Sequence, residues 1–420
     1  MNLHSTDVLV AGGGPAGIAA AIAASRMGAK VLLIEQMGFF GGMPTAGMVS
    51  PFQISSAKGK YIIQGIFAEV VERLKKEGMA RDGALFGQTH IEFDHEWLKL
   101  VLFDMLKEAG VTFLLHTFVT GAVLQKDVLK GVATQSKSGE VKILAGVTID
   151  CTGDGDVAAH AGAPYEKGRI QDGLMQPMTL NFRLAGVDKS RLPSRDEINA
   201  VFQSAKKEGR VSIPRETLLW FETPRPDEIH VNSSRVLHVD GTKAEDLTRA
   251  EDEGRVQMVQ LFRLLKEQVA GFENSYIASS GASIGIRETR RIKGEYVLTE
   301  ADVMSGQKFD DQIAVASYPI DIHDPSGPGL KWQPLPEGVY YGIPYRCLLP
   351  KKVDNLLVAG RPISVDPIAF SSTRVSPTSM ALGQAAGIAA ALAAKKRVSP
   401  RALKVAEIQK ALRDQGANID

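Results

Sequence analysis

The sequence predicts an α/β protein in which a nucleotide-binding fold is interrupted by an inserted α+β domain. A strand, a glycine turn, a helix and a second strand occupy residues 8–35. From about Tyr165, polar loops, prolines and alternating strands replace this pattern, and a buried strand ending in glycine returns after Asn355. We therefore expect a discontinuous first domain at 1–165 and 345–420, and a substrate or cap domain at 166–344.

A glycine turn follows the first apolar run. Residues 12–17 have the spacing G-x-G-x-x-G. Gly12 permits a tight turn, Gly14 lets the backbone approach a pyrophosphate, and Gly17 lets the next helix pack close to the sheet. The N-terminus of that helix presents free N–H groups and partial positive charge to phosphates. The pattern predicts a dinucleotide site, and the alternative is an ordinary βαβ unit.

Glu35 directly follows the second apolar run, residues 31–34. A carboxylate at this distance from the glycines can accept hydrogen bonds from ribose hydroxyls. An acidic residue there favours FAD or NAD over a nucleotide with a 2′-phosphate.

Amphipathic helices and short strands fill the rest of the first domain. Apolar residues spaced three and four apart from Phe67 to Leu74 predict a helix over 66–77, and the same spacing from Leu98 predicts a helix that Gly110 ends. Strands are expected at 111–116, over 119–134 and at 147–151.

The inserted domain has fewer regular patterns. Thr248 and Glu251 have the form of a capping box, and apolar spacing from Met258 to Leu265 marks a helix behind them. Residues 309–322 are strand-like. The Pro/Gly-rich loop after them is consistent with either a connector or an active-site lid.

The first pattern returns near the C-terminus. Residues 356–361 read LLVAGR, a buried strand ending in glycine, and a small-residue helix is expected over 377–394. A polar helix follows within 399–420. A NAD-dependent dehydrogenase usually keeps its Rossmann sheet continuous, whereas completion of an N-terminal βαβ unit by a C-terminal segment is the pattern of FAD enzymes.

Composition and charge narrow the class of protein. The 420 residues are 44% hydrophobic and 23% charged with a net charge of +1, which points to neither a nucleic-acid nor a membrane partner. Cys151 and Cys347 form no CxxC motif, so a redox disulfide and a metal cluster are not expected. The longest apolar run, 380–394, is interrupted, and the first strand begins too early for a signal peptide. We expect a cytoplasmic protein without a membrane span.

Further motifs follow the glycine turn in order along nearly the whole chain. They are GGMPT at 41–45, DCTGDGD at 150–156, IGIRETRR at 284–291, NLLVAGR at 355–361, SSTR at 371–374 and GQAAG at 383–387. With these motifs the chain resembles the FAD-dependent oxidoreductases of the glutathione-reductase-like flavoprotein superfamily, and especially a bacterial family distantly similar to fumarate reductase flavoproteins. The resemblance implies a Rossmann-like FAD-binding domain of glutathione-reductase type, with FAD as the cofactor.

The resemblance also implies which residues bind the cofactor. Gly41 and Gly42 would let backbone run close to the flavin or its pyrophosphate, and Asp154 or Asp156 would hydrogen-bond near the phosphates or ribityl chain; a plain loop and an Asx-turn or helix cap are the alternatives. The expected cofactor-binding residues are Gly12, Gly14, Pro15, Ala16, Gly17, Glu35, Gln36, Gly41, Gly42, Met43, Val119, Thr152, Gly153, Asp154, Gly360, Arg361, Gly383, Gln384, Ala385 and Ala386.

The helix that begins near Pro377 has a use in flavin chemistry. Reduction places negative charge on the N1–C2=O edge of a flavin, and a helix N-terminus aimed there would stabilise it. The small residues at 383–387 would allow close approach. The alternative is a core helix that packs through small residues.

One segment departs from the family pattern. Many relatives resemble T-H-x-A-H-S-S where residues 366–372 read DPIAFSS. Pro367 and Phe370 replace both histidines, so histidyl attachment of FAD is impossible there. Substrate identity is therefore not carried over from these relatives.

His323 is a candidate for proton transfer because it lies at a predicted strand end beside the Pro/Gly loop. Asp321, two residues earlier, shares its strand face and could orient it. A structural histidine is the alternative. Arg346 and Arg374 lie near cofactor-facing segments and could bind a substrate carboxylate, and Tyr345 could donate a hydrogen bond to a substrate oxygen. Ion pairs at a domain interface are the alternative for the arginines, including the cluster at 287–291.

Together these features predict an enzyme that transfers a hydride between flavin N5 and a small polar, anionic organic substrate, as a dehydrogenase or ene-reductase. The chain has neither a second GxGxxG motif nor a cysteine pair, so a separate electron acceptor or donor is expected. The alternatives are a flavin-dependent lyase, hydratase or isomerase, and a flavoprotein subunit of an electron-transfer complex. The sequence does not indicate an oligomeric state.

Overall fold

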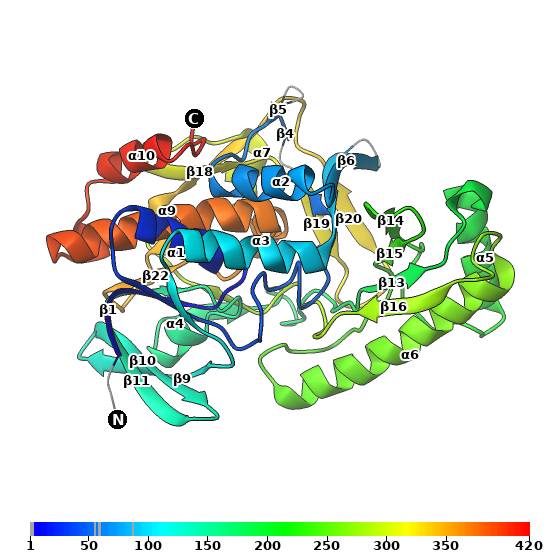
Figure 1. The fold of residues 1–420 in the computed structure, drawn as a ribbon, viewed down its shortest axis with the longest axis horizontal. Helices are drawn as coiled ribbons and strands as arrows, with labels where there is room; N and C mark the ends of the chain where they lie inside the picture. The colour runs from blue at the N-terminus through cyan, green and yellow to red at the C-terminus, as the bar shows by residue number, and fades with distance from the viewer. Residues whose placement is uncertain (1–3, 54–55, 58–59, 86–87) are drawn as a thin grey trace.

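The computed structural model describes residues 4–53, 56–57, 60–85 and 88–420, which form a mixed α/β structure (Figure 1). Its helices are α1 (Pro15–Arg26), α2 (Ile66–Lys76), α3 (His95–Glu108), α4 (Asp156–His160), α5 (Arg195–Lys207), α6 (Ala244–Gln268), α7 (Glu300–Ser305), α8 (Pro367–Thr373), α9 (Ser376–Lys396) and α10 (Val405–Asp414), with 3-10 turns at Lys189–Arg191, Tyr345–Leu348 and Pro400–Ala402. Its strands are β1 (His4–Ala11), β2 (Val31–Ile34), β3 (Phe52–Gln53), β4 (Ser56–Ala57), β5 (Lys60–Tyr61), β6 (Ala80–Leu85), β7 (Gln88–Phe93), β8 (Thr112–Leu114), β9 (Phe118–Gln125), β10 (Val128–Ser136), β11 (Gly139–Asp150), β12 (Tyr165–Lys167), β13 (Phe182–Ala185), β14 (Trp220–Glu222), β15 (Ile229–Val231), β16 (Tyr276–Ser280), β17 (Arg290–Ile292), β18 (Gln312–Ala316), β19 (Ile320–His323), β20 (Leu330–Gln333), β21 (Tyr341–Pro344) and β22 (Leu356–Val358).

The largest sheet of the described residues joins the two ends of the chain. Its strand order is β8-β2-β1-β11-β10-β9, and β22 also pairs with β11. Strands β8, β2, β1, β11 and β22 are parallel neighbours, and residues 148–150 of β11 lie beside β22. Strand β2 and the end of β1 are buried on both faces, as parallel strands covered by helices must be. The C-terminal segment therefore completes a Rossmann-like fold, as the sequence predicts.

Helices cover one face of the parallel strands, and apolar residues of α4 and β10 pack on the other. Helices α1 and α9 pack directly against each other, with α2 and α3 beside them (Figure 1). A Cβ atom at Gly383 would clash with the Ala16 carbonyl, and one at Gly387 with the Ala20 carbonyl. Glycine at these positions is therefore what lets the two helices come so close. Among the described residues, no helix combines the length and apolarity needed to cross a membrane.

A second unit lies to one side, at the right of Figure 1. Its antiparallel sheet has the order β14-β15-β13-β16, and α5 and α6 accompany it. Phe182 and Val231 of the sheet share a buried core with Phe202 of α5 and Leu261 of α6. This unit forms one wall of the cavity described below.

The segment from about residue 298 to 349 packs with the first unit rather than the second. Leu298, Ile313 and Ile343 belong to the same core cluster as the apolar residues of α1 and α9. Strands β18 and β21 pair with each other beneath α9. The part of residues 166–344 that forms a separate core therefore ends well before residue 344.

Helix α6 begins earlier than the sequence predicts. Ala244 is its first residue, so the prediction of a capping box at Thr248 was wrong. The Thr248 hydroxyl instead donates to the Ala244 carbonyl at 2.8 Å, within the first turns of the helix. Glu251 accepts a hydrogen bond from the backbone N–H of Ile284 at 2.6 Å and so fixes a loop beside the cavity.

Candidate active site

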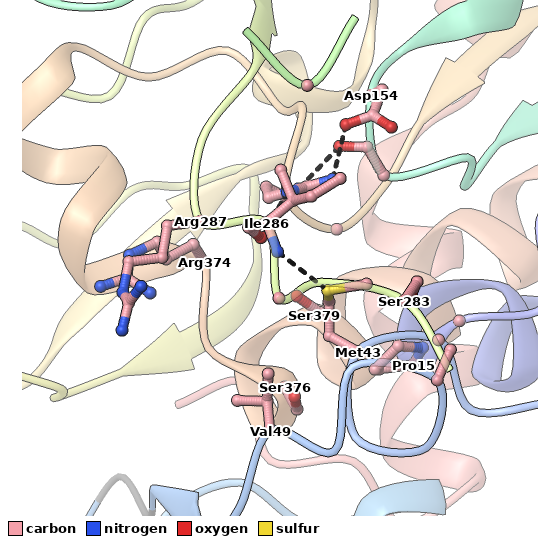
Figure 2. Close-up of a pocket in the computed structure, with 18 of the residues that line it drawn as sticks. Pro15, Met43, Val49, Asp154, Ser283, Ile286, Arg287, Arg374, Ser376 and Ser379 are labelled. Atoms are coloured by element: carbon pink, nitrogen blue, oxygen red, sulfur yellow. Dashed lines mark hydrogen bonds and ion pairs between the residues drawn. The ribbon is translucent and has the colours of Figure 1, made fainter. Parts of the chain in front are cut away.

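A cavity of about 950 Å³ lies at the carboxyl ends of the parallel strands and extends to the second unit. The segments that follow β1, β2, β8, β11 and β22 all contribute to its wall, as expected for a ligand site in an open parallel sheet. Figure 2 shows part of this wall, with Pro15 and Met43 on one side and Arg287 and Arg374 on another. The cavity has a nucleotide half beside the glycine turn and a second half lined by arginines.

The glycine turn forms a cradle at the N-terminus of α1. Gly12 has a φ of 99°, and a Cβ there would clash with the Cys151 carbonyl. Gly42 lies so close that its Cβ would be 2.8 Å from the Gly14 Cα, and the Gly41 N–H donates to the Gly13 carbonyl at 2.8 Å. Helix α1 has no side-chain cap and no acidic residue in its first turn. Its first N–H groups are therefore available to an anion.

Glu35 is buried at the end of β2. Its Oε2 accepts from the Gly13 N–H and its Oε1 from the Met37 N–H, both at 2.7 Å. Burial raises the pKa of this carboxyl, and the two backbone donors oppose the rise. Each oxygen keeps a lone pair that can accept a hydroxyl hydrogen from a ribose.

Asp154 and Arg361 connect three segments at the cavity wall. Arg361 donates to Asp154 Oδ1 at 2.6 Å, to the Gly153 carbonyl at 2.8 Å and to the Ile286 carbonyl at 2.5 Å. Thr289 also donates to Asp154, at 2.7 Å. This network holds the loop after β11, the end of β22 and the 284–289 segment together (Figure 2).

The N-terminus of α9 also faces the cavity. Arg374, Val375, Ser376 and Ser379 line it, and the helix has no side-chain cap and no acid in its first turn. The small residues further along α9 do not reach the cavity. Gly383 packs on α1, because the side of α9 that carries the glycines faces that helix. This agrees with the alternative interpretation of α9 as a core helix that packs through small residues.

Most of the predicted cofactor-binding residues line the nucleotide half of this cavity. They are Gly12, Gly14, Pro15, Ala16, Glu35, Gln36, Gly42, Met43, Val119, Thr152, Gly153, Asp154, Gly360 and Arg361. The others lie behind the wall. Gly41 hydrogen-bonds Gly13 beneath the cradle, and Gly17 packs against the Gly12 carbonyl. Ala385 and Ala386 are fully buried, and Gln384 caps α2 by accepting from the Ile66 N–H at 3.1 Å.

Arginines dominate the second half of the cavity. Arg215, Arg287 and Arg374 line it, together with Tyr318, Asp321 and His323. Arg374 donates to Asp321 Oδ2 at 3.1 Å, and Tyr318 donates to the same oxygen at 3.2 Å. Figure 2 shows the side chains of Arg287 and Arg374 lying side by side. The sequence singled out Arg374, His323 and Asp321, and the structure brings these three together.

His323 is held in its neutral form. Arg235 donates to its Nδ1 at 3.0 Å, and its Nε2 lies 3.4 Å from Asp321 Oδ1. Because a guanidinium can only donate, Nδ1 is the acceptor and Nε2 carries the hydrogen. Burial, and then the charge of Arg287, lowers the pKa of His323 to about 3 against the pull of Asp321. Both ring nitrogens are engaged, so the ring orients its neighbours.

Tyr345 and Arg346 lie outside the cavity wall. The Tyr345 hydroxyl is buried and donates to the Pro400 carbonyl at 3.1 Å. Arg346 forms a two-pronged ion pair with Asp311, at 2.9 and 3.1 Å. Both residues belong to the 3-10 turn Tyr345–Leu348, and sequence spacing does not reveal which way such a turn directs its side chains.

Several cavity residues carry no sequence signal. Arg215 lies in an irregular loop between α5 and β14, where no periodicity assigns it a direction. Asn181 and Asn232 also line the cavity, and each has a buried amide oxygen without a partner among the described residues. The pairing of β13 with β15 brings Asn181 and Asn232, which flank these strands, to one wall of the cavity.

The fold and the site together define a dinucleotide-binding protein with a substrate pocket at its cofactor. The chain belongs to the FAD dependent oxidoreductase family, whose model matches residues 7–412. FAD is therefore its cofactor, and the chain is a flavoprotein oxidoreductase.

Individual relatives are distant. The chain is 28% identical over 162 residues to a thiamine thiazole synthase from Methanococcus vannielii, an alignment that spans 36% of this chain and 58% of that protein. Its fold is similar to that of a geranylgeranyl bacteriochlorophyll reductase-like protein from Thermoplasma acidophilum, with 13% identity, a TM-score of 0.50, and coverage of 99% and 85% of the two chains. CabE, an aromatic hydroxylase from angucycline biosynthesis, gives 12% identity, a TM-score of 0.50 and coverage of 98% and 66%. At such identities the likeness concerns the fold.

The residues present fit FAD. Gly14 and Gly42 pack backbone against backbone at the cavity wall, where a Cβ at Gly42 would clash, and the uncapped N-terminus of α1 suits a pyrophosphate. Glu35 offers acceptors for ribose hydroxyls, and the uncapped N-terminus of α9 borders the same cavity further along. These groups would hold the nucleotide and leave the arginine-lined half free for a second molecule.

Proposed function

We propose that this flavoprotein transfers a hydride between flavin N5 and a small polar organic anion. The observation that carries the proposal is the continuity of one cavity, from the cradle at Gly14 to the guanidinium groups of Arg215, Arg287 and Arg374. FAD, when bound, supplies the hydride-accepting or hydride-donating atom. The protein supplies binding, orientation and exclusion of water.

The arginines would bind the anionic group of the substrate. A guanidinium presents its N–H groups as a planar fork that matches a carboxylate. Asp321 fixes Arg374 through the 3.1 Å ion pair, and Arg287 is anchored by hydrogen bonds to the Pro177 carbonyl at 2.8 Å and Thr179 Oγ1 at 2.6 Å. Guanidinium groups anchored in this way lose little conformational freedom when a substrate binds.

Two amide oxygens support a substrate that also bears a hydroxyl group. Asn181 Oδ1 and Asn232 Oδ1 are buried without partners among the described residues, on the same cavity wall. A buried acceptor that lacks a donor is unfavourable by about 1–3 kcal/mol, so a donor on the ligand would relieve that cost. This favours oxidation of a C–H bond next to a hydroxyl as the direction of the reaction.

The electrons would leave through a separate carrier or oxygen. Both cysteines of the chain are free and buried, Cys151 behind the glycine turn and Cys347 in the main core. A dithiol relay within the chain therefore has no candidate residues. We propose that a separate acceptor meets the reduced cofactor after the product has left.

An anaerobic substrate panel tests the proposal. FAD-loaded protein is mixed with hydroxy acids, enoates, sugars and cyclic amines, and the visible absorbance of the flavin is followed. We expect bleaching by a hydroxy acid, with stoichiometric formation of the oxidised product. Turnover of a panel member with no electron acceptor and no bleaching would instead indicate a lyase, hydratase or isomerase.

A further inference from the structure

The arginine-lined half of the cavity holds more positive than negative charge. Four guanidinium groups, those of Arg215, Arg235, Arg287 and Arg374, interact electrostatically with one another around the carboxylate of Asp321. Arg215 and Arg235 are buried, and Arg287 and Arg374 are half-buried. His323 is neutral there, as its contacts show. Glu288 forms an ion pair with Arg291 and also attracts Arg374 from further away.

The hydrogen-bond partners show which of these charges are compensated. Arg374 meets the carboxylate of Asp321. Arg235 donates to the Gly327 and Gly329 carbonyls at 2.9 and 3.1 Å, and the acidic groups of Asp324 and Glu216 attract it from further away. Arg287 and Arg215 hydrogen-bond only neutral acceptors, Arg215 through its Nε to the Thr217 carbonyl at 2.8 Å. Two positive charges at the cavity wall therefore have no ion-paired carboxylate among the described residues, and Asp321 attracts both only from further away.

Unpartnered donors mark the same place. Arg215 Nη1 and Arg374 Nε are buried and have no hydrogen-bond partner among the described residues. Only 5% of Arg215 is exposed, although it lines the cavity. Burial and the neighbouring guanidinium of Arg235 lower the pKa of Arg215 to about 10, and burial and Arg374 lower that of Arg287. An anion in the cavity would remove both the unpaired donors and the mutual repulsion.

We propose that the substrate of this pocket carries two negative charges on one small molecule, one facing Arg215 and the other the Arg287–Arg374 pair. This inference deepens the proposed function and rests on it for the site. Two carboxylates, or one phosphate group, would supply the charge. A monoanion would leave one buried guanidinium without a counter-charge, and buried unpaired charges are strongly unfavourable.

The binding of small anions to the FAD-loaded protein tests whether the ligand of this pocket carries two negative charges. Calorimetry at constant ionic strength compares acetate with malonate, succinate and inorganic phosphate, at a pH at which phosphate is a dianion. We expect a dianion to bind about tenfold or more tightly than acetate. Tighter binding of a dicarboxylate than of phosphate identifies two carboxylates as the ligand chemistry, and the reverse order identifies a phosphate group.

Two variants tie the preference to these residues. Arg215→Gln and Arg287→Gln each remove one positive charge, and each should reduce the dianion-to-acetate affinity ratio about tenfold. Arg263→Gln removes the same charge from an exposed position on α6 and should leave the ratio unchanged. A ratio near one in the unmodified protein, or a ratio that neither pocket variant alters, would overturn the inference.

The inference and the proposed function can fail separately. Bleaching of the flavin by a neutral or singly charged substrate, with no preference for dianions, would leave hydride transfer standing and remove the charge count. Tight, arginine-dependent binding of dianions without bleaching by any panel member would support the charge count and contradict hydride transfer.

Discussion

At the scale of single residues, Glu35 gives the sharpest link between the sequence and the cofactor. Glu35→Gln replaces one carboxylate oxygen by an NH2 group, which would face a backbone N–H of Gly13 or Met37. We expect FAD affinity to fall by about 1.5–3 kcal/mol, or about tenfold to a hundredfold, because hydrogen bonds to a charged acceptor are lost. Equilibrium titration of the FAD-free protein with FAD measures the change.

Glu140→Gln is the matched control, since Glu140 is exposed near the start of β11. It should leave FAD affinity unchanged. Equal affinity in the Glu35 and Glu140 variants would mean that Glu35 does not contact the nucleotide.

The buried histidines predict how stability depends on pH. Burial lowers the pKa of His95 to about 4, that of His323 to about 3, and that of His230 well below 6.5. The unfolded chain binds protons at these sites below pH 6.5 and the folded chain does not, so stability falls as pH drops from 6.5 towards 4. Buried carboxyls oppose this, because burial raises the pKa of Asp150 to about 6 and also raises the pKa values of Glu35, Asp154 and Glu288, so the folded chain takes up these protons first.

Each of the three histidines contributes a positive slope of stability with pH in that window, by up to about 1.4 kcal/mol per pH unit. Thermal unfolding at a series of pH values measures it. His323→Gln should flatten the slope, because it removes one of the buried histidines. An equal slope in His323→Gln and in the unmodified protein would contradict this account.

Single site residues could be predicted from the sequence where the local backbone geometry requires one residue type. Gly12, Gly14 and Glu35 follow from the turn that a dinucleotide needs, and they line the cavity. Arg215 and Asn232 could not be predicted, because tertiary packing of loops and an antiparallel sheet brings them to the site. Tyr345 and Arg346 are close in sequence to cofactor-facing strands, but their turn carries them elsewhere.

At the scale of elements, the contact between α1 and α9 depends on glycine. Gly387→Ala would gain about 1 kcal/mol of helix propensity on an open surface. Here the added methyl group meets the Ala20 carbonyl, and overpacking of about 1–3 kcal/mol outweighs the gain. We expect a lower free energy of unfolding in urea.

Gly121→Ala in β9 is the comparison, because its Cβ would lie 3.5 Å from the Ala133 Cβ, an ordinary contact. It should be close to neutral. If Gly387→Ala proved as stable as Gly121→Ala, the two helices would not be in the close contact described.

Periodicity predicted the existence of elements better than their ends. The helix expected over 66–77 is α2, and the one expected over 377–394 is α9. The start of α6 was missed because a sequence with the form of a capping box occurs inside the helix, where Thr248 bonds back to Ala244. The residue that precedes the helix, Lys243, makes no side-chain cap and so gave no signal.

At the scale of the whole molecule, the sheet was predictable because its pieces share one pattern. The strand before Gly360 reads like the strand before Gly12, and β22 does pair in parallel with β11. The packing of residues 298–349 against the first unit could not be predicted. The sequence pattern of its strands would be the same if they packed against the second unit. Arg361 likewise joins segments that lie far apart in the sequence, because it donates to Gly153, Asp154 and Ile286.

The central claim is that the flavin and the arginine-lined half of the cavity work on one small organic anion. Rapid anaerobic mixing of the FAD-loaded protein with the reducing substrate, in the unmodified chain and in Arg374→Ala, tests this claim most directly. We expect the variant to keep FAD, to be bleached by dithionite as the unmodified protein is, and to lose reduction by the substrate at least about a hundredfold, as truncation of a substrate-binding charge does. Unchanged reduction kinetics in Arg374→Ala would contradict the account.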